Sequence, residues 1–153
     1  MEVYAGMIDY VNESVDRVLD HLRGKGELEN TLVVFISDNG PSKTTINDYL
    51  ALGGSVADFA RSFDNSLENK GRPGSSTDIG PGWAFACPTP LRLCKGDGAQ
   101  GGIQVPALVK LPGSENQEMR SIDTFAHITD LMPTSLEIAE IAHPVNYRET
   151  PVA

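Results

Sequence analysis

The sequence predicts an α/β domain, and three features carry that prediction. Residues 2–23 repeat apolar side chains at helical spacing, and residues 31–36 follow as a run that is apolar at nearly every position. Such a run is typical of a strand covered on both faces in a parallel sheet. A second strand over residues 105–111 and a late helix continue the pattern. We therefore expect a parallel or mixed sheet flanked by helices, with strand 31–36 at its centre.

The first helix is expected over residues 2–23 and should pack on one face of the sheet. Acidic side chains crowd its beginning, while Arg23 and Lys25 lie at its end, which suits the helix dipole. Gly24 and Gly26 provide the stop signal. The apolar positions recur at spacings of three and four, the period of an amphipathic helix: Val3, Met7, Ile8, Val11, Val15, Val18, Leu19 and Leu22.

The middle of the chain, residues 41–92, is rich in Gly, Ser, Asn, Asp and Pro. Within it, only residues 55–63 read as a short helix. A stretch of this length with so little regular structure is unusual in a compact domain unless it is functional.

The last third of the chain contains a strand and a helix. Pro106 either fixes the start of the strand over residues 105–111 or places that strand at an edge of the sheet. A helix is expected from about residue 129 to residue 142, because good N-cap residues precede an apolar side. The residues that follow, 143–153, are expected to form an irregular tail.

Composition excludes several classes of partner. The 153 residues are 40% hydrophobic and carry a formal charge of −9. This charge argues against nucleic acid and against an anionic membrane, because both require clustered Lys and Arg. No apolar run approaches the roughly 20 residues that span a bilayer, and the N-terminus has no basic segment of a signal peptide. Cys87 and Cys94 are expected to be free thiols, which slightly favours a cytoplasmic location and otherwise leaves the compartment open.

Two adjacent polar side chains, Asp38 and Asn39, stand where the first strand stops in "VVFISDNGP". In open α/β sheets, ligands bind beyond the carboxyl ends of the strands. A carboxylate and an amide oxygen are hard ligands that suit Ca²⁺ or Mg²⁺. Asp-Asn-Gly is also good turn chemistry, since Asn39 and Gly40 tolerate positive φ, and on this tripeptide alone the plain turn is the better interpretation.

The order of several segments is more specific than any one of them. After the helix and "LVVFISDNG" come "SFDNSLENKGR", "PLRLCKGDGAQGGIQVPALVKLPG" and "FAHITDLMPTSLEIAEI". From Tyr4 to about Ala142, this order resembles the later part of a sulfatase of the arylsulfatase type, in the alkaline-phosphatase-like superfamily. The resemblance implies an α/β fold with part of an alkaline-phosphatase-like or sulfatase-like sheet flanked by helices. It also implies that residues 1–153 are the C-terminal portion of a sulfatase domain, a fragment without the N-terminal nucleophile segment.

The resemblance also implies a binding site. Asp38 and Asn39 match the pair that holds part of a Ca²⁺ ion in such enzymes, and Lys95 matches a lysine that contacts the sulfate group. A cation and an ammonium would stabilise the charge that grows on the sulfate oxygens as the ester bond breaks. The competing interpretation of Lys95 is an exposed loop lysine.

Other residues of the family site have no match. The nucleophile of such sulfatases is a formylglycine made within a C-x-P-x-R motif, and the stretch "CPTPLR" from Cys87 to Arg92 fails on spacing and on position. Formylglycine is therefore not encoded in this chain, and no catalytic residue is expected in it. The early acidic pair of metal ligands is also absent, and Gln104 stands where an arginine is common. The three histidines match no catalytic position and are expected to be structural or surface residues: His21, His127 and His143.

The leading interpretation is a segment of a sulfuric-ester hydrolase that supplies part of a Ca²⁺ site and a sulfate-contacting lysine, and that is inactive alone. Its expected partners are a small sulfate ester and the N-terminal sulfatase segment. One alternative is a phosphate or phosphonate ester hydrolase of the same superfamily, because sulfate and phosphate share tetrahedral geometry. Another is a non-catalytic remnant or binding module that kept the fold.

Overall fold

The computed structural model describes residues 1–114 and 118–151, and its longest element is the N-terminal helix α1 (Glu2–Gly24). The helix expected over residues 2–23 is confirmed. It carries Glu2 in its first turn and His21 and Arg23 in its last turn, as the helix dipole favours. A short 3₁₀ helix, η1 (Leu28–Asn30), links α1 to the first strand.

The main sheet consists of two antiparallel strands, β1 (Val33–Ile36) and β2 (Ala107–Lys110). Val33 lies opposite Lys110, and Ile36 lies opposite Ala107. Both expected strands are confirmed, and Pro106 directly precedes β2. The expected parallel or mixed sheet, with β1 central and covered on both faces, is not observed in the described residues, since β1 has one antiparallel partner there and Phe35 is 48% exposed. An apolar run predicts that a strand forms, but it does not fix the direction of the partner strand.

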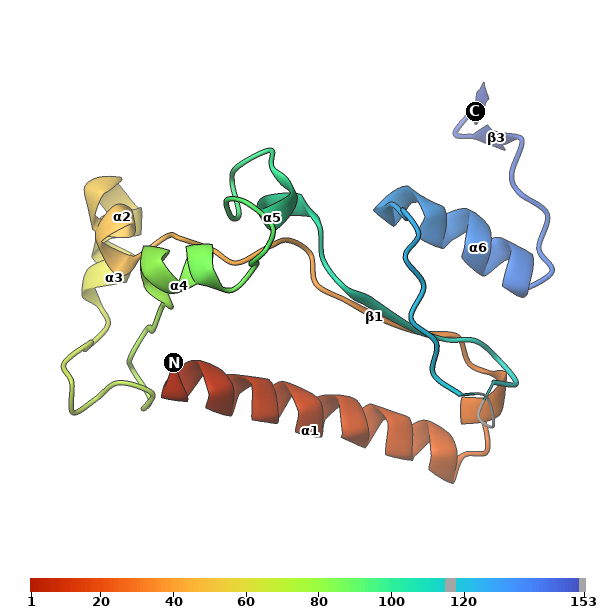
Figure 1. Ribbon diagram of the computed structural model, residues 1–153, viewed down its shortest axis with the longest axis horizontal. Helices are drawn as coiled ribbons and strands as arrows, with labels where there is room; N and C mark the ends of the chain where they lie inside the picture. The colour runs from red at the N-terminus through yellow and green to blue at the C-terminus, as the bar shows by residue number, and fades with distance from the viewer. Residues whose placement is uncertain (115–117, 152–153) are drawn as a thin grey trace.

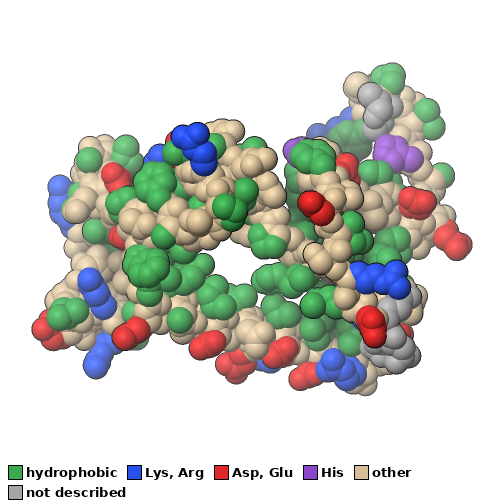
Figure 2. Space-filling model, in the orientation of Figure 1, with side chains coloured by type: hydrophobic (Ala, Val, Ile, Leu, Met, Phe, Trp, Pro, Cys, Tyr) green, Lys and Arg blue, Asp and Glu red, His purple; other side chains and the backbone are tan. Residues whose placement is uncertain are grey.

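Helix α1 runs alongside the β1–β2 pair, but it buries none of its own residues (Figure 1). Its closest contacts to another element are with η1. An opening with apolar side chains at its rim separates one part of the helix from the rest of the molecule (Figure 2). The expected packing of this helix on a face of the sheet is therefore not observed.

Residues 37–106 leave the end of β1 and return at the start of β2, and they contain four short helices. These are α2 (Ile46–Ala51), α3 (Gly54–Arg61), α4 (Gly80–Ala86) and α5 (Gln100–Ile103). Helices α2 and α3 pack against each other, and α3 confirms the helix expected over residues 55–63.

The sequence interpretation missed α2 and α4 because turn residues open both helices. The carboxylate of Asp48 accepts a hydrogen bond of 2.7 Å from the backbone N–H of Thr45, which caps the first turn of α2. Helix α4 begins with Gly80, Pro81 and Gly82, a combination that normally indicates a turn, although proline is well tolerated in a first helical turn.

The C-terminal residues form a 3₁₀ turn, η2 (Ile128–Asp130), a helix, α6 (Leu131–Ile138), and a small hairpin of β3 (Asn146–Tyr147) and β4 (Thr150–Pro151). The late helix is confirmed, although it is shorter than expected. The expected irregular tail is wrong, since the hairpin lies within it. Within residues 1–114 and 118–151, no helix has the length and apolar character needed to cross a membrane.

The buried core of the described residues is small. Its members are Leu28, Ala57, Ala60, Ala84 and Cys94. Many larger apolar side chains are instead exposed, among them Met7, Ile8, Val18, Leu108 and Val109. The described residues therefore leave much of their apolar surface in contact with solvent.

Candidate functional site

The residues that follow β1 present two sets of side-chain oxygens. The amide nitrogen Nδ2 of Asn39 donates to the carbonyl of Gly40 at 2.9 Å, which commits the nitrogen end of that amide and leaves Oδ1 free. Asp38 is exposed, and its carboxylate has no hydrogen bond or ion pair with the part of the chain that the structure describes. Hard oxygen ligands without partners are what a Ca²⁺ site requires from a protein.

Backbone conformation argues against one explanation of this tripeptide. Asp38, Asn39 and Gly40 all have negative φ, so the turn that requires positive φ at Asn39 or Gly40 is not formed. Gly40 is needed for another reason: a Cβ there would lie 1.9 Å from the carbonyl oxygen of Gly101. The N–H of Gly40 donates to the carbonyl of Gly102 at 2.9 Å, so the end of β1 and the start of α5 touch backbone to backbone.

Gly101 and Gly102 in α5 also allow two backbone segments to lie close together. A Cβ on Gly101 would lie 2.2 Å from the carbonyl oxygen of Leu93, and one on Gly102 would lie 2.4 Å from that of Cys94. Gly101 also donates its N–H to the carbonyl of Arg92 at 2.9 Å. Three buried glycines thus let three backbone segments meet at the end of β1: residues 40–41, 92–95 and 101–102.

Lys95 is brought to this meeting point through its backbone. Its N–H donates to the carbonyl of Pro41 at 2.8 Å, two residues after Asn39, and its side chain is exposed. The three residues singled out from the sequence, Asp38, Asn39 and Lys95, therefore lie at the same end of β1. A site shared by these residues requires this proximity, which arises because the segment between β1 and β2 folds back on the strand end.

A cluster of three further residues adjoins Lys95, and the sequence analysis missed it. The ammonium of Lys43 lies 3.1 Å from Oδ2 and 3.3 Å from Oδ1 of Asp97, and it stands 6.0 Å from the centre of the Phe85 ring. The buried thiol of Cys94 lies 3.6 Å from Oδ2 of Asp97. Lys43 and Asp97 are 54 residues apart, and nothing in their local sequence signals the pairing.

The electrostatics of the cluster follow from these contacts. The hydrogen bond from Lys43 lowers the pKa of the Asp97 carboxyl, and the same bond raises the pKa of Lys43. Burial raises the pKa of the Cys94 thiol, although the nearby ammonium acts in the opposite direction. The lysine and the carboxylate are therefore charged at neutral pH, while the thiol is protonated.

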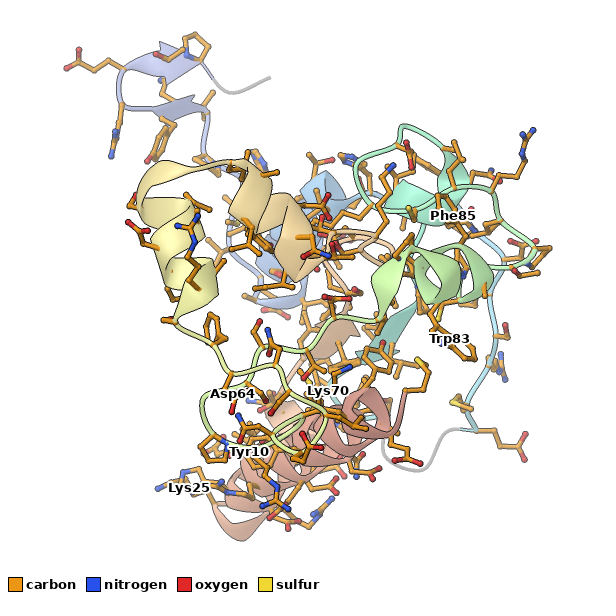
Figure 3. All side chains as sticks on the ribbon, turned by 90° about the vertical axis from the view of Figure 1, so that its left-hand side faces the viewer. Tyr10, Lys25, Asp64, Lys70, Trp83 and Phe85 are labelled. Carbon is orange, nitrogen blue, oxygen red and sulfur yellow. The ribbon has the colours of Figure 1, made fainter. Side chains whose placement is uncertain are left out.

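A cavity of about 1260 Å³ lies beside Asn39, between the N-terminal turns of α1, the loop after β1 and helix α4. Lys70 and Trp83 line it, and Figure 3 shows both on the side of α4 that faces α1. Gln104 lines the same cavity, so the position where an arginine is common does lie near the candidate site. The cavity thus combines polar residues, Asn39 among them, with an aromatic ring.

Cys87 and the three histidines, which the sequence analysis also considered, form no hydrogen bond or ion pair with Asp38, Asn39 or Lys95 within the described residues. Cys87 is exposed at the end of α4 and forms no disulfide. The imidazole of His127 caps η2, with Nδ1 2.9 Å from Oγ1 of Thr129. His21 and His143 are exposed. Among residues 1–114 and 118–151, no group of three or more His, Cys, Asp and Glu side chains is arranged to hold a metal.

The oxygens of Asp38 and Asn39 fit Ca²⁺ in kind but not in number. Calcium usually takes about 6–8 oxygen ligands, of which these two side chains supply two or three. A site at this strand end would therefore need further ligands beyond Asp38 and Asn39.

Sequence comparison places the chain in a family. The family model described as Sulfatase matches residues 1–141, so the chain belongs to the sulfatase family. It is 42% identical over 144 residues to an uncharacterized sulfatase of Schizosaccharomyces pombe. The aligned region is 94% of this chain and 26% of that relative. It is 33% identical over 153 residues to an arylsulfatase of Klebsiella aerogenes. The aligned region is 99% of this chain and 32% of that relative. The chain therefore spans about a quarter to a third of the length of these relatives, and the resemblance inferred from its motifs is confirmed.

Proposed function

We propose that the chain is a segment of a sulfuric-ester hydrolase, in which Asp38 and Asn39 contribute to a Ca²⁺ site and Lys95 contacts the sulfate group. The observation that carries the proposal is the 2.8 Å bond from the N–H of Lys95 to the carbonyl of Pro41, because it holds a cationic residue at the strand end where the free oxygens lie. Membership of the sulfatase family supports the reaction class. An alkaline-phosphatase-like sheet, completed by sequence outside these residues, is part of the same proposal.

Each residue has a distinct task in this proposal. A bound Ca²⁺ ion supplies positive charge that stabilises the sulfate oxygens as the ester bond breaks. Asp38 provides one negative charge and Asn39 a neutral oxygen, so together they neutralise only half of the charge on the ion. The exposed ammonium of Lys95 adds a second positive charge on the side of the substrate, where its effect is largest in the transition state.

The nucleophile and the remaining metal ligands come, in this proposal, from sulfatase sequence other than these 153 residues. The exposed apolar side of α1 and the cavity beside Asn39 are the surfaces on which that sequence would pack. The isolated chain is therefore expected to bind Ca²⁺ weakly and to leave sulfate esters intact, because covalent catalysis of the family's kind is not available to it.

A chimera tests the proposal. In it, these 153 residues replace the matching third of the K. aerogenes arylsulfatase, and hydrolysis of 4-nitrophenyl sulfate is followed by absorbance. Because that relative is an arylsulfatase, an aryl sulfate is the first substrate to try. We expect turnover by the chimera and none by the chain alone.

Point variants of the chimera then assign the roles. Asp38→Asn and Lys95→Met should each reduce kcat/KM by about 10²–10³-fold, which is typical for the loss of one group that stabilises developing charge. Lys25→Met, an exposed lysine just beyond α1, is the matched control and should have little effect. Calorimetry on the chain alone should detect at most weak Ca²⁺ binding that disappears in Asp38→Asn. Turnover by the isolated chain, or an active chimera that tolerates both substitutions, would refute the proposal.

A further inference from the structure

We propose that the ion pair between Lys43 and Asp97, which closes over the thiol of Cys94, is a clasp that positions Lys95 beside Asp38 and Asn39. In this inference Lys43 and Asp97 are positioning residues and do not themselves touch the substrate. The catalytic consequence rests on the function proposed for Lys95, whereas the clasp itself rests only on the geometry of the described residues.

Two hydrogen bonds between Asp97 and Cys94 close the turn that carries Lys95. The backbone N–H of Asp97 donates to the carbonyl of Cys94 at 3.1 Å, and Oδ2 of Asp97 accepts from the backbone N–H of Cys94 at 3.4 Å. Lys95 and Gly96 are the two residues between Cys94 and Asp97. The orientation of Lys95 therefore depends on the side chain two residues after it.

Lys43 fixes this turn to the loop that follows β1. Its ammonium reaches both oxygens of the Asp97 carboxylate, at 3.1 and 3.3 Å, and it lies over the Phe85 ring of α4. The backbone bond from Lys95 to Pro41 is a second connection between the same two segments. The backbone bond sets the distance between the segments, and the ion pair prevents the turn from rotating about that bond.

The ion pair is suited to a local role. The side chains of Lys43 and Asp97 are 44% and 25% exposed, and ion pairs with this much solvent contact contribute little to global stability. Loss of the pair is therefore expected to leave the unfolding transition nearly unchanged and to loosen the turn. An unchanged unfolding transition together with a loosened turn would therefore distinguish a positioning role from a general structural role.

Cys94 reports on the clasp directly. Its thiol is fully buried against Asp97, whereas the other cysteine, Cys87, is exposed. In a Cys87→Ser background, a thiol reagent such as 5,5′-dithiobis(2-nitrobenzoic acid) can react only with Cys94, and only when the turn opens. Removal of Lys43 disfavours the thiolate, because the ammonium lowers the pKa of Cys94. A faster reaction in Lys43→Met would therefore reflect greater exposure of the thiol and not greater acidity.

The first experiment measures the labelling rate of Cys94 in the full chain. Lys43→Met and Asp97→Asn should each raise the rate by about tenfold or more, because labelling follows the population of the open turn. Lys43→Arg, which keeps both the positive charge and the Asp97 carboxylate that accepts from Cys94, should keep most of the protection. Asp58→Asn, which removes the exposed ion pair with Arg61, is the matched control and should leave the rate unchanged. Unchanged labelling in both single variants that still unfold cooperatively in urea would overturn the clasp.

The second experiment connects the clasp to Lys95 in the sulfatase chimera. Lys43→Met should lower kcat/KM for 4-nitrophenyl sulfate by about tenfold, a smaller loss than that of Lys95→Met, and Lys43→Arg should restore it. Full activity of a Lys43→Met chimera in which Cys94 has become reactive would overturn the positioning role. If Cys94 responds as expected but Lys95→Met retains activity, the clasp stands and the function proposed for Lys95 fails.

Discussion

Gly40 illustrates how a single residue links the two chain segments of the candidate site. It follows Asn39 directly, and its missing side chain leaves room for the carbonyl of Gly101. The same contact aligns the N–H of Gly40 with Gly102. Positions of this kind are sensitive to a single methyl group, because the atoms in contact belong to the backbone and have little freedom to move.

Gly40→Ala is therefore expected to destabilise the chain by about 1–3 kcal/mol, the usual cost of overpacking a tight contact. Gly98→Ala is the matched control, since a Cβ there meets no atom within 4 Å. Urea denaturation of both variants measures the difference. Equal stability of the two would show that the end of β1 and the start of α5 are not in close contact.

The pH range of the clasp follows from two pKa shifts. Lys43 lowers the pKa of Asp97 below its ordinary 3.8, so the contribution of this carboxylate is present above that value and is lost as the pH falls through the folded-state pKa. Asp97 raises the pKa of Lys43 above 10.5, so the contribution of the ammonium is present below that value and is lost as the pH rises through the folded-state pKa. Lys43, Asp97 and Cys94 are the titratable groups of this cluster, and Phe85 covers it.

Titration of the Asp97 carboxyl by carbon NMR tests this range. We expect a midpoint below 3.8 in the unaltered chain and a return toward 3.8 in Lys43→Met. An identical Asp97 midpoint with and without Lys43 would contradict the pairing.

At the scale of the elements, the spacing of apolar residues predicted which helices and strands form, but it did not predict the direction in which the strands pair. The spacing of apolar residues identified α1, and alternating turn residues bounded β1 and β2. Strand direction depends on where the chain returns after residues 37–106, which no local pattern records. Asp38, Asn39 and Lys95 were identified by their place in a family-like order of motifs. Lys43 and Asp97 were not, because their contact arises only when the loop after β1 meets the turn after Cys94.

Helix α1 offers a test at this scale. Its amphipathic pattern is strong, yet Val18 is 61% exposed. We expect Val18→Gln to leave the stability of the chain within about 0.5 kcal/mol and to reduce self-association in analytical ultracentrifugation, because the side chain covers nothing in the chain itself. Arg17→Gln, its exposed neighbour, is the control and should not reduce association. A large loss of stability in Val18→Gln would show that α1 packs more tightly than described.

The described residues form an open arrangement of elements with little buried interior. Their buried core is small, many of their apolar side chains are exposed, and an opening lies over part of α1 (Figure 2). Since the chain spans 26% and 32% of two sulfatase relatives, the surface around this opening is where the remainder of such a fold would be expected to pack.

Dye binding tests this expectation. The chain alone should enhance the fluorescence of 8-anilinonaphthalene-1-sulfonate, which reports exposed apolar surface. In the chimera with the K. aerogenes arylsulfatase, the enhancement per molecule should fall, although the chimera contains more residues. Weak dye binding by the isolated chain would indicate that its apolar side chains are covered in solution, for example by a second copy.

The antiparallel pairing of β1 with β2 has a further consequence for evolution. The two strands close one long excursion of the chain, residues 37–106, and the excursion contains Asp38, Asn39, Lys95 and most of the cavity lining. The entropy of closing a flexible loop grows slowly, by about 0.6 kcal/mol for each doubling of its length. Insertions and deletions around α2 and α3 can therefore accumulate without unpairing the strands. The two anchored ends, which carry Asp38, Asn39 and Lys95, keep their backbone contacts when the length of the segment between them changes.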